Sequence, residues 1–259
     1  MLSADNTDEL RILLWGLTGA GKSNFIKQCG ATAKYIDRSG QQVTELPEVG
    51  NGVNSSKSYM SCRDPIMSDQ LPPETEKIIS YDFWHIVAGR AKHVVLIDMP
   101  GFDDNELSES KNFELFALWL LDVDARYQRK PWLHGVIYVQ PISSGHTKAC
   151  KRCFDLLELV CGQHTIGNMS IVLTKGEGDT DNVAKVDAYK ANVFSKYGNR
   201  VTLKVDKHRQ LAAVACIEIL WNCRPVRLQF LNEWERYNSF AMTSAGAFVD
   251  EDLYKKKGD

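Results

Sequence analysis

The amino-acid sequence predicts an α/β fold: a mainly parallel sheet sandwiched by helices, with a C-terminal helical extension. Short runs that are apolar almost throughout alternate along the chain with longer segments of helical periodicity. Strands that are apolar at nearly every position are typical of a sheet whose two faces are both covered. A chain of 259 residues is long enough for one large domain of this kind. The alternation therefore predicts parallel strands joined by right-handed crossovers.

Five apolar runs are predicted as strands, in chain order residues 10–16, 93–99, 134–140, 169–174 and 201–205. A further strand is expected within "IISYDFWHIVA", which precedes the second of them. The remainder of residues 31–90 is rich in Gly, Asn, Ser and Pro, so we expect it to form mainly loops.

Five segments between these strands are predicted as helices, namely residues 22–29, 110–127, 147–161, 182–196 and 210–222. In the third, Cys150, Phe154, Leu157 and Cys161 recur at helical spacing and form one apolar stripe. A last amphipathic helix is expected from residue 226 to about residue 240. Its aromatic stripe favours packing against the rest of the protein, and a helix that meets a partner or a membrane surface is the alternative.

These elements divide the chain into four parts. Residues 1–8 are expected to be a disordered N-terminus and residues 9–224 the α/β domain. Residues 225–245 are expected to form the C-terminal helix, and residues 246–259 a flexible tail.

Charge and composition limit the classes of binding partner and the cellular location that we expect for this protein. The 31 Lys and Arg residues nearly balance the 33 Asp and Glu residues, which argues against a basic surface for nucleic acid. No apolar run reaches the ~20 residues that span a bilayer, and the polar N-terminus is unlike a targeting segment. Seven cysteines, mostly within apolar segments, indicate reduced thiols and a cytoplasmic location. The pair Cys150 and Cys153 lacks a second ligand pair at metal spacing, so packing is favoured over a zinc or redox role.

The strongest chemical signal is "GLTGAGKS", residues 16–23, which matches G-x-x-x-x-G-K-[ST] between a predicted strand and a predicted helix. Its glycines let successive N–H groups turn towards phosphate oxygens, and the positive end of the helix adds to the attraction. Lys22 is expected to reach the β- and γ-phosphates, and the Ser23 hydroxyl to bind Mg²⁺. The nucleotide is therefore expected to contact Leu17, Thr18, Gly19, Ala20, Gly21, Lys22, Ser23 and Asn24.

A second signal, "VVLIDMPGFDD", places an aspartate at the end of an apolar strand and a glycine three residues later. Asp98 is expected to hold Mg²⁺ through a water molecule, so Ser23 and Asp98 form the candidate metal site. The N–H of Gly101 is expected to sense the γ-phosphate, which makes Lys22 and Gly101 the candidate catalytic groups.

The chain resembles the septin-like G-domain GTPases in "GLTGAGKSNFI", "VLIDMPGFDD", "LHGVIYV" and "LLELVCG". This family includes the immunity-associated (GIMAP) and chloroplast-import-receptor branches, and the resemblance is closest to a related fungal group. It covers roughly residues 10–220 and implies a Ras-like P-loop NTPase fold with residues 9–224 as the G domain. It also implies GTP or GDP as ligand, Mg²⁺ as cofactor, and a homodimer formed across the nucleotide face.

Guanine is read in such proteins by [NT]-K-x-D, and this chain has "LTKGEGD" at the corresponding place. Thr174 and Lys175 fit the pattern, whereas Glu177 stands where aspartate is expected. Glutamate carries the same pair of acceptor oxygens one methylene further out, so we expect Thr174, Lys175 and Glu177 to bind the base. Asp179 is the alternative acceptor, and a loop of solvated acids is the alternative to base recognition.

Two further departures concern hydrolysis. In "VGNGVNSSKS", Lys57 stands where a Mg²⁺-binding threonine is expected, and Ser56 or Ser58 could supply the oxygen instead. Phe102 follows Gly101 where Ras-type enzymes use a glutamine to orient the attacking water. Slow hydrolysis is therefore expected, with an arginine from a partner, or with the local polar residues Asp103, Asp104 and His146, as possible help.

The sequence thus predicts a slow GTPase switch that changes conformation at residues 51–63 and 102–110. One alternative is a nucleotide-binding assembly module with little or no hydrolysis. The other is a P-loop enzyme that uses ATP, either an ATPase or a small-molecule kinase.

Overall fold

A computed structural model describes residues 9–36, 42–46, 78–102, 109–142, 147–176, 187–188, 191, 194–195, 201–205 and 209–255. Its main feature is a six-stranded sheet with the strand order β4-β5-β1-β6-β7-β8. All neighbouring strands are parallel except β4 and β5, which are antiparallel. The strands are β1 (Glu9–Trp15), β4 (Ile79–Val87), β5 (Arg90–Asp98), β6 (Gly135–Pro141), β7 (Met169–Gly176) and β8 (Val201–Val205).

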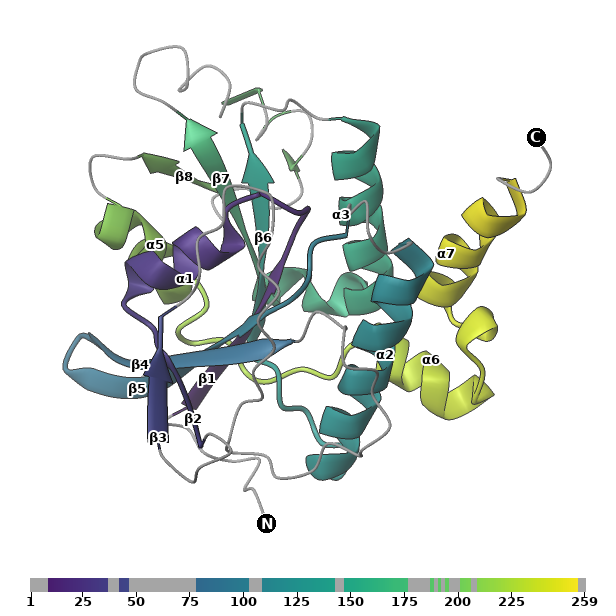
Figure 1. Ribbon diagram of the computed structural model, residues 1–259, viewed down its shortest axis with the longest axis horizontal. Helices are drawn as coiled ribbons and strands as arrows, with labels where there is room; N and C mark the ends of the chain where they lie inside the picture. Colours follow the sequence, from purple (N-terminus) through teal and green to yellow (C-terminus); the bar gives the residue numbers. More distant parts are fainter. Residues whose placement is uncertain are drawn as a thin grey trace.

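Helices cover both faces of this sheet (Figure 1). On one face lie α1 (Lys22–Cys29) and α5 (Arg209–Glu218), and on the other lie α2 (Glu109–Arg126) and α3 (Lys148–Cys161). Successive side chains of β1 alternate between the two cores: Ile12 and Leu14 pack towards α1 and α5, whereas Leu13 and Trp15 pack towards α2 and α3. The predicted α/β fold class is therefore confirmed.

The predicted elements agree closely with the structure where it describes them. The strand expected within residues 78–88 is β4, and the helix expected over residues 22–29 is α1 with the same bounds. Helix α3 begins after Thr147, whose side-chain oxygen accepts a hydrogen bond from the Cys150 N–H at 3.2 Å. The helix expected over residues 182–196 falls largely outside the described residues. A short 3-10 helix, η1 (Gln163–Asn168), leads from α3 into β7.

The segment expected to form mainly loops contains a second, two-stranded antiparallel sheet. It is made by β2 (Ala33–Ile36) and β3 (Gln42–Glu45). Thr32, just before β2, exchanges two backbone hydrogen bonds with Asp82 of β4, at 2.9 and 3.1 Å. The polar composition concealed this pairing because a short hairpin needs few apolar residues.

The C-terminal extension consists of α6 (Gln229–Tyr237), the 3-10 turn η5 (Phe240–Met242) and α7 (Ser244–Lys255). It lies outside the layer formed by α2 and α3 (Figure 1). Phe230 is fully buried, as expected for a helix that packs on the domain. The boundary predicted at residue 245 is corrected: residues 246–255 belong to α7, where the buried Ala245 and Val249 anchor the helix. The small residues of "SAGAF" gave too weak an apolar pattern to reveal it.

An ion-pair network joins this extension to α2. The guanidinium of Arg227 donates to both carboxylate oxygens of Asp124, at 2.8 and 3.1 Å, and to Glu235 at 2.6 Å. Hydrogen bonds to Asp124 raise the pKa of Arg227 above its ordinary value. The Asp124 side chain is only 6% exposed, and Arg227 is the counter-ion that it contacts.

Replacing Arg227 with alanine should therefore lower the free energy of unfolding by about 3–5 kcal/mol, because Asp124 is left buried without its counter-ion. Chemical denaturation measures this loss. The matched control is Arg129→Ala, which removes an exposed guanidinium that also binds Glu235 and should cost far less. Equal losses in the two variants would contradict a special role for the buried pair.

His134, which directly precedes β6, is held in its neutral form. Its Nδ1 accepts a hydrogen bond from the Arg11 N–H at 3.2 Å, and the residue is 7% exposed. Burial, followed by the charges of Arg11 and Lys92, lowers the pKa of His134 from 6.5 to about 4. Below pH 6.5 the unfolded chain therefore protonates His134, whereas the folded protein keeps it neutral until about pH 4.

We expect the free energy of unfolding to be unaffected by His134 above pH 6.5 and to fall between pH 6.5 and about 4. The loss is at most about 3 kcal/mol, from about 1.4 kcal/mol per pKa unit. In His134→Asn the side-chain oxygen can replace Nδ1 as acceptor without titrating. Denaturant unfolding at a series of pH values should show a shallower decline for that variant, and identical slopes would contradict the assignment.

No helix in the described part of the chain is both long enough and apolar enough to cross a membrane.

Candidate functional site

The predicted phosphate loop connects the buried end of β1 to the start of α1. Gly16, Gly19 and Gly21 have φ values of 151°, 70° and 100°, which allow the tight curl of the loop. At Gly16 a Cβ atom would lie 2.5 Å from the carbonyl oxygen of Val139, so no larger residue fits there. Gly21 is the N-cap of α1, and the N-terminus of that helix therefore opens into the loop.

The ammonium group of Lys22 lies over the loop. Its Nζ donates to the carbonyl oxygens of Gly16 and Leu17, both at 3.1 Å, and the residue is 7% exposed. These contacts hold the positive charge beside the backbone that is expected to surround the phosphates. Lys22 is thus a buried cation placed at the N-terminus of a helix.

Ser23 and Asp98, the two predicted metal residues, lie together although they are 75 positions apart in the chain. The Ser23 hydroxyl donates to Oδ2 of Asp98 at 3.2 Å. The other carboxylate oxygen, Oδ1, is shielded from solvent and has no hydrogen-bond partner. Burial raises the pKa of Asp98, and the charge of Lys22 and the Ser23 hydrogen bond oppose this effect.

This pair fits a hard divalent cation. A hydroxyl and a carboxylate are the oxygen ligands that Mg²⁺ prefers, and the orphaned Oδ1 is an acceptor that a metal-bound water could satisfy. Of the described residues, no three His, Cys, Asp or Glu side chains cluster to form another metal site.

Gly101 packs directly on the phosphate loop. A Cβ atom at this position would lie 2.1 Å from Oγ1 and 2.3 Å from the N atom of Thr18. On its other side, the Gly101 carbonyl accepts a hydrogen bond from Nδ2 of Asn112 at 3.2 Å. The segment after Asp98 is therefore held between the loop and the start of α2.

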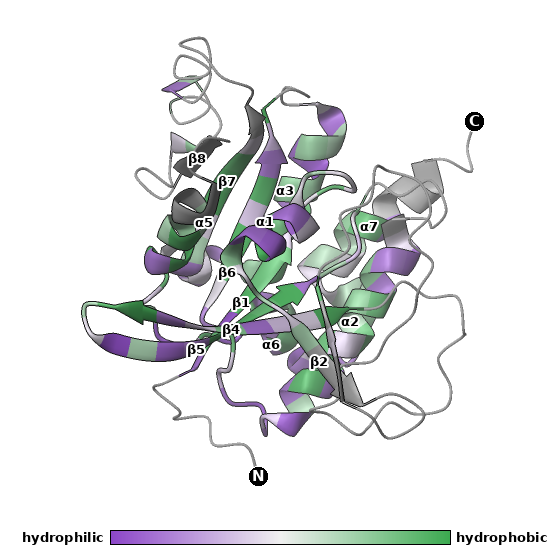
Figure 2. Ribbon diagram, turned by 60° about the vertical axis from the view of Figure 1, so that its left-hand side comes forward, coloured by the Kyte–Doolittle hydropathy of each residue, from purple (hydrophilic) through white to green (hydrophobic). Residues whose placement is uncertain are grey.

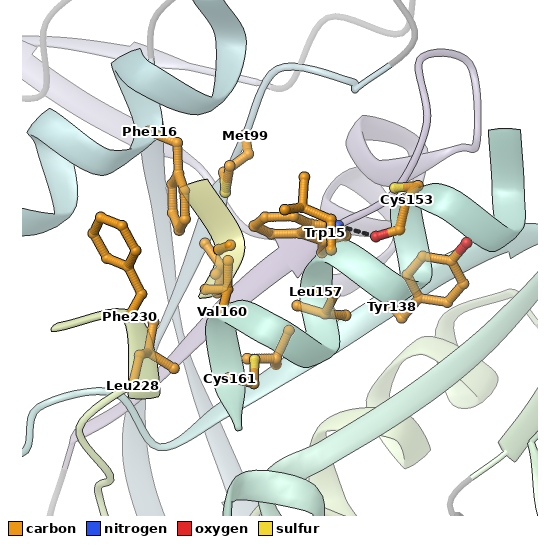
Figure 3. Close-up of a cluster of buried hydrophobic side chains, with 14 of the residues drawn as sticks. Trp15, Met99, Phe116, Tyr138, Cys153, Leu157, Val160, Cys161, Leu228 and Phe230 are labelled. Carbon is orange, nitrogen blue, oxygen red and sulfur yellow. Dashed lines mark hydrogen bonds between the residues drawn. The ribbon is translucent and has the colours of Figure 1, made fainter. Parts of the chain in front are cut away.

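Phe102 points into the core. It is 5% exposed and stacks on Trp15, with ring centroids 4.2 Å apart. Figure 3 shows the surroundings of Trp15, whose Nε1 donates to the Cys153 carbonyl oxygen at 3.0 Å. Phe102 is thus an apolar anchor for the segment, and its ring is directed away from solvent.

Thr174, one of the three residues expected to bind the base, contacts the phosphate loop. Its hydroxyl donates to the Ala20 carbonyl oxygen at 2.6 Å, and its backbone carbonyl accepts from the Ile142 N–H at 2.8 Å. Thr174 lies at the end of β7 and is 5% exposed. It ties the predicted base-reading strand end to the loop that precedes α1.

Several predicted functional residues lie outside the described residues, so their predictions stay open. They are Ser56, Lys57, Ser58, Asp103, Asp104, His146, Glu177 and Asp179, together with the side chain of Lys175 and all of residues 51–63.

Sequence reasoning missed the roles of Asn112 and Trp15. Asn112 is 6% exposed in a helix whose neighbouring Phe113 and Phe116 are buried. A polar residue next to an apolar helical stripe was the available signal for it. Trp15 gave no signal, because its partners Phe102 and Cys153 are distant in the sequence.

The cysteines in the described part of the chain form no second site. The six described cysteines are free thiols, and Cys150 and Cys153 are both buried in the core. Burial raises the pKa of the Cys161 thiol to about 12, which leaves it protonated at neutral pH.

No protein-family model and no curated protein sequence matches the chain. Among solved structures, it is similar to Toc33 from Arabidopsis thaliana in complex with Mg²⁺ and GMPPNP: 12% identity, 84% of this chain and 87% of that chain covered, TM-score 0.46. It is also similar to Toc33 in complex with GDP and Mg²⁺, with 11% identity, 84% of this chain and 86% of that chain covered, and a TM-score of 0.45. A third similar structure is the G domain of the T. maritima FeoB iron transporter, with 14% identity, 82% of this chain and 96% of that chain covered, and a TM-score of 0.42.

The strand order and the glycine-rich loop between β1 and α1 establish a Ras-like P-loop fold on their own.

Proposed function

We propose that this protein binds GTP and GDP with Mg²⁺ and hydrolyses GTP slowly to GDP and phosphate. The observation that carries the proposal is the convergence of Lys22, Ser23 and Asp98 at the glycine-rich start of α1. A polyphosphate bound to a divalent ion fits this arrangement. The Lys22 ammonium and the N-terminus of α1 attract the phosphates, and the Ser23 and Asp98 oxygens can bind the metal.

Phosphate binding would use this chain's own groups in a defined way. The N–H groups of the loop and of the first turn of α1 would donate to the β-phosphate. Lys22 would exchange its carbonyl partners for phosphate oxygens, since charge-assisted hydrogen bonds are the stronger ones. Ser23 and Asp98 would hold Mg²⁺, which supplies charge neutralisation between the β- and γ-phosphates when bound.

The segment after Asp98 would change its position when the γ-phosphate is bound or lost. Gly101 lies against Thr18, so a third phosphate near this part of the loop has to displace the glycine or hydrogen-bond to its N–H. The peptide that follows Gly101 is held by Asn112, which donates to the Gly101 carbonyl, and by Phe102, which stacks on Trp15. The geometry therefore suits a segment whose position depends on whether the γ-phosphate is present.

Guanine specificity is proposed from Thr174, Lys175 and Glu177. The hydrogen bond from Thr174 to Ala20 places the end of β7 beside the phosphate loop, so the residues that follow would lie near a base whose phosphates occupy the loop. The Glu177 carboxylate would accept hydrogen bonds from the base.

Slow turnover follows from the burial of Phe102. A side chain stacked on Trp15 inside the core cannot orient a water molecule for attack on the γ-phosphate. The same observation supports a second candidate function, a nucleotide-binding assembly module with little or no hydrolysis. In the slow GTPase, two copies would pair across the nucleotide face, and each would supply an arginine that assists hydrolysis in the other. The assembly module would pair without such an arginine.

Competition binding tests the base assignment. GTP, GDP, ATP and ADP are titrated against a fluorescent guanine nucleotide, for the native protein and for Glu177→Ala. We expect a clear preference for guanine nucleotides that Glu177→Ala weakens selectively. A preference for ATP, or an equal loss for both bases, would overturn it. Phosphate release measured over a range of protein concentrations separates the slow GTPase from the assembly module.

A further inference from the structure

Gly101 lies so close to the phosphate loop that no further group fits between them. A Cβ atom at this position would lie 2.3 Å from the N atom and 2.4 Å from the Cα atom of Thr18. The α-carbon of Gly101 is therefore in van der Waals contact with the backbone of the loop. The proposed function places the γ-phosphate of GTP at this point, so GTP can bind fully only after Gly101 has moved away from Thr18.

The residue after Gly101 is fixed in the core. Phe102 stacks on Trp15, and the ring of Trp15 meets Phe116 of α2 edge-on, with ring centroids 5.2 Å apart. Figure 3 shows Trp15 and Phe116 within one cluster of buried side chains. In Figure 2, α2 carries both hydrophobic and hydrophilic residues along its length, as expected for a helix with one buried face. Phe102 therefore anchors the chain directly after Gly101.

Asn112 holds Gly101 from the side of α2. It lies in the first turn of that helix, and its Nδ2 donates to the Gly101 carbonyl oxygen at 3.2 Å. The residue is only 6% exposed, so the hydrogen bond is sheltered from competing water. Gly101 is thus confined between the phosphate loop and α2. A movement away from Thr18 either breaks this hydrogen bond or pushes against the Asn112 side chain.

Only half of the Asn112 carboxamide is used. Its Oδ1 is shielded from solvent and has no hydrogen-bond partner among the described residues. A buried acceptor without a partner costs stability, which an apolar side chain of similar shape would avoid. The neighbouring buried residues of α2, Phe113 and Phe116, are apolar. The donor to Gly101 is therefore what distinguishes asparagine from leucine at this position.

We propose that Asn112 sets the preference of the site between GDP and GTP. The inference rests on the proposed function, because it concerns the same nucleotide site. Asn112 holds Gly101 on Thr18, an arrangement that leaves room for a diphosphate and excludes the γ-phosphate. The hydrogen bond persists when GDP binds and is lost when GTP binds, so it lowers the affinity for GTP alone. Asn112 is a positioning residue that acts on the nucleotide through Gly101.

Isothermal titration calorimetry with GTP and with GDP, both with Mg²⁺, tests this effect on the native protein and on two variants. Asn112→Ala removes the hydrogen bond and the bulk behind Gly101, whereas Asn112→Leu removes the hydrogen bond and keeps most of the volume. We expect both variants to favour GTP over GDP about two- to tenfold more than the native protein does, which is the effect of one hydrogen bond. An unchanged ratio of the two dissociation constants, or a selective loss of GTP affinity, overturns the inference.

The matched control is Asp124→Asn. Asp124 is another buried polar residue of α2, but it contacts Arg227 and lies about three turns from Asn112. Its replacement should lower the temperature of thermal unfolding and leave the ratio of dissociation constants unchanged. A control that shifts the ratio as much as Asn112→Ala would contradict a specific role for Asn112. A native protein that binds neither nucleotide overturns the proposed function, and this inference with it.

Association kinetics test the obstruction itself. Because Gly101 has to leave Thr18 first, only a fraction of the native protein is ready to take up GTP at any moment, whereas all of it can take up GDP. Stopped-flow mixing with fluorescent GTP and GDP analogues should therefore show slower association of the GTP analogue. In Asn112→Ala the two rates should approach each other. Equal rates in the native protein would contradict an obstruction by Gly101.

Discussion

Replacing Lys22 with alanine is expected to lower the affinity for GTP by at least about a hundredfold. Removing one partner of a desolvated charge-assisted contact costs about 2–5 kcal/mol, and tenfold in affinity corresponds to about 1.4 kcal/mol. The contacts of Nζ with the Gly16 and Leu17 carbonyls place the ammonium where the phosphates are expected. Isothermal titration calorimetry with GTP and GDP measures the loss.

The matched control is Lys27→Ala. Lys27 lies on the same helix, but it is exposed near the C-terminal end of α1, so its removal should change the affinity little. Thermal unfolding without nucleotide checks that the Lys22 variant still folds, because it also loses two hydrogen bonds within the loop. Unchanged GTP affinity in a folded Lys22→Ala protein would show that the loop is not the nucleotide site.

Asp98→Asn should separate function from stability. We expect this variant to lose most of the Mg²⁺-dependent gain in GTP affinity, by about tenfold or more, while metal-free GDP binding changes little. Burial raises the pKa of Asp98, so keeping this carboxylate ionised at neutral pH opposes folding. The metal-free variant should therefore be more stable than the native protein, with the Ser23 hydroxyl still bonded to the amide oxygen.

Two measurements check this. Nucleotide titrations with Mg²⁺ and with a chelator give the metal dependence, and denaturant unfolding without metal gives the stability. With its raised pKa, Asp98 keeps a proton in the folded native protein at pH values where the unfolded chain has lost it. The native protein therefore loses stability as the pH rises through that pKa, whereas Asp98→Asn does not, so the difference in unfolding free energy should grow over this range. Equal losses of GTP affinity with and without metal would place the carboxylate away from the metal.

Local patterns allowed most of the fold to be predicted. The bounds of α1 were predictable because glycines flank it at Gly21 and Gly30, both with positive φ. The strands were predictable because burial on both faces makes them apolar throughout. The two-stranded sheet of β2 and β3 and the helix α7 could not be recognised, because polar or small residues form them and their stability depends on distant contacts.

The candidate site also has features that local motifs predict and contacts that they do not predict. The loop, Ser23, Asp98 and Gly101 follow from motifs whose spacing reflects phosphate and metal chemistry. The bond from Asn112 to Gly101 and the stack of Phe102 on Trp15 join segments that only the folded chain brings together. The hydrogen bond from the Thr174 hydroxyl to Ala20 was not predictable for the same reason, because the two residues are far apart in the sequence. Base binding by Thr174, Lys175 and Glu177 stays a prediction.

A crystal structure with a non-hydrolysable GTP analogue and Mn²⁺ in place of Mg²⁺ would locate both the nucleotide and the metal. We expect phosphate density bound by the N–H groups of residues 19–23, with Lys22 Nζ moved onto phosphate oxygens. We also expect an anomalous peak from Mn²⁺ beside the Ser23 hydroxyl and Asp98. A loop without phosphate density, with Lys22 still on the Gly16 and Leu17 carbonyls, would contradict the proposed nucleotide site.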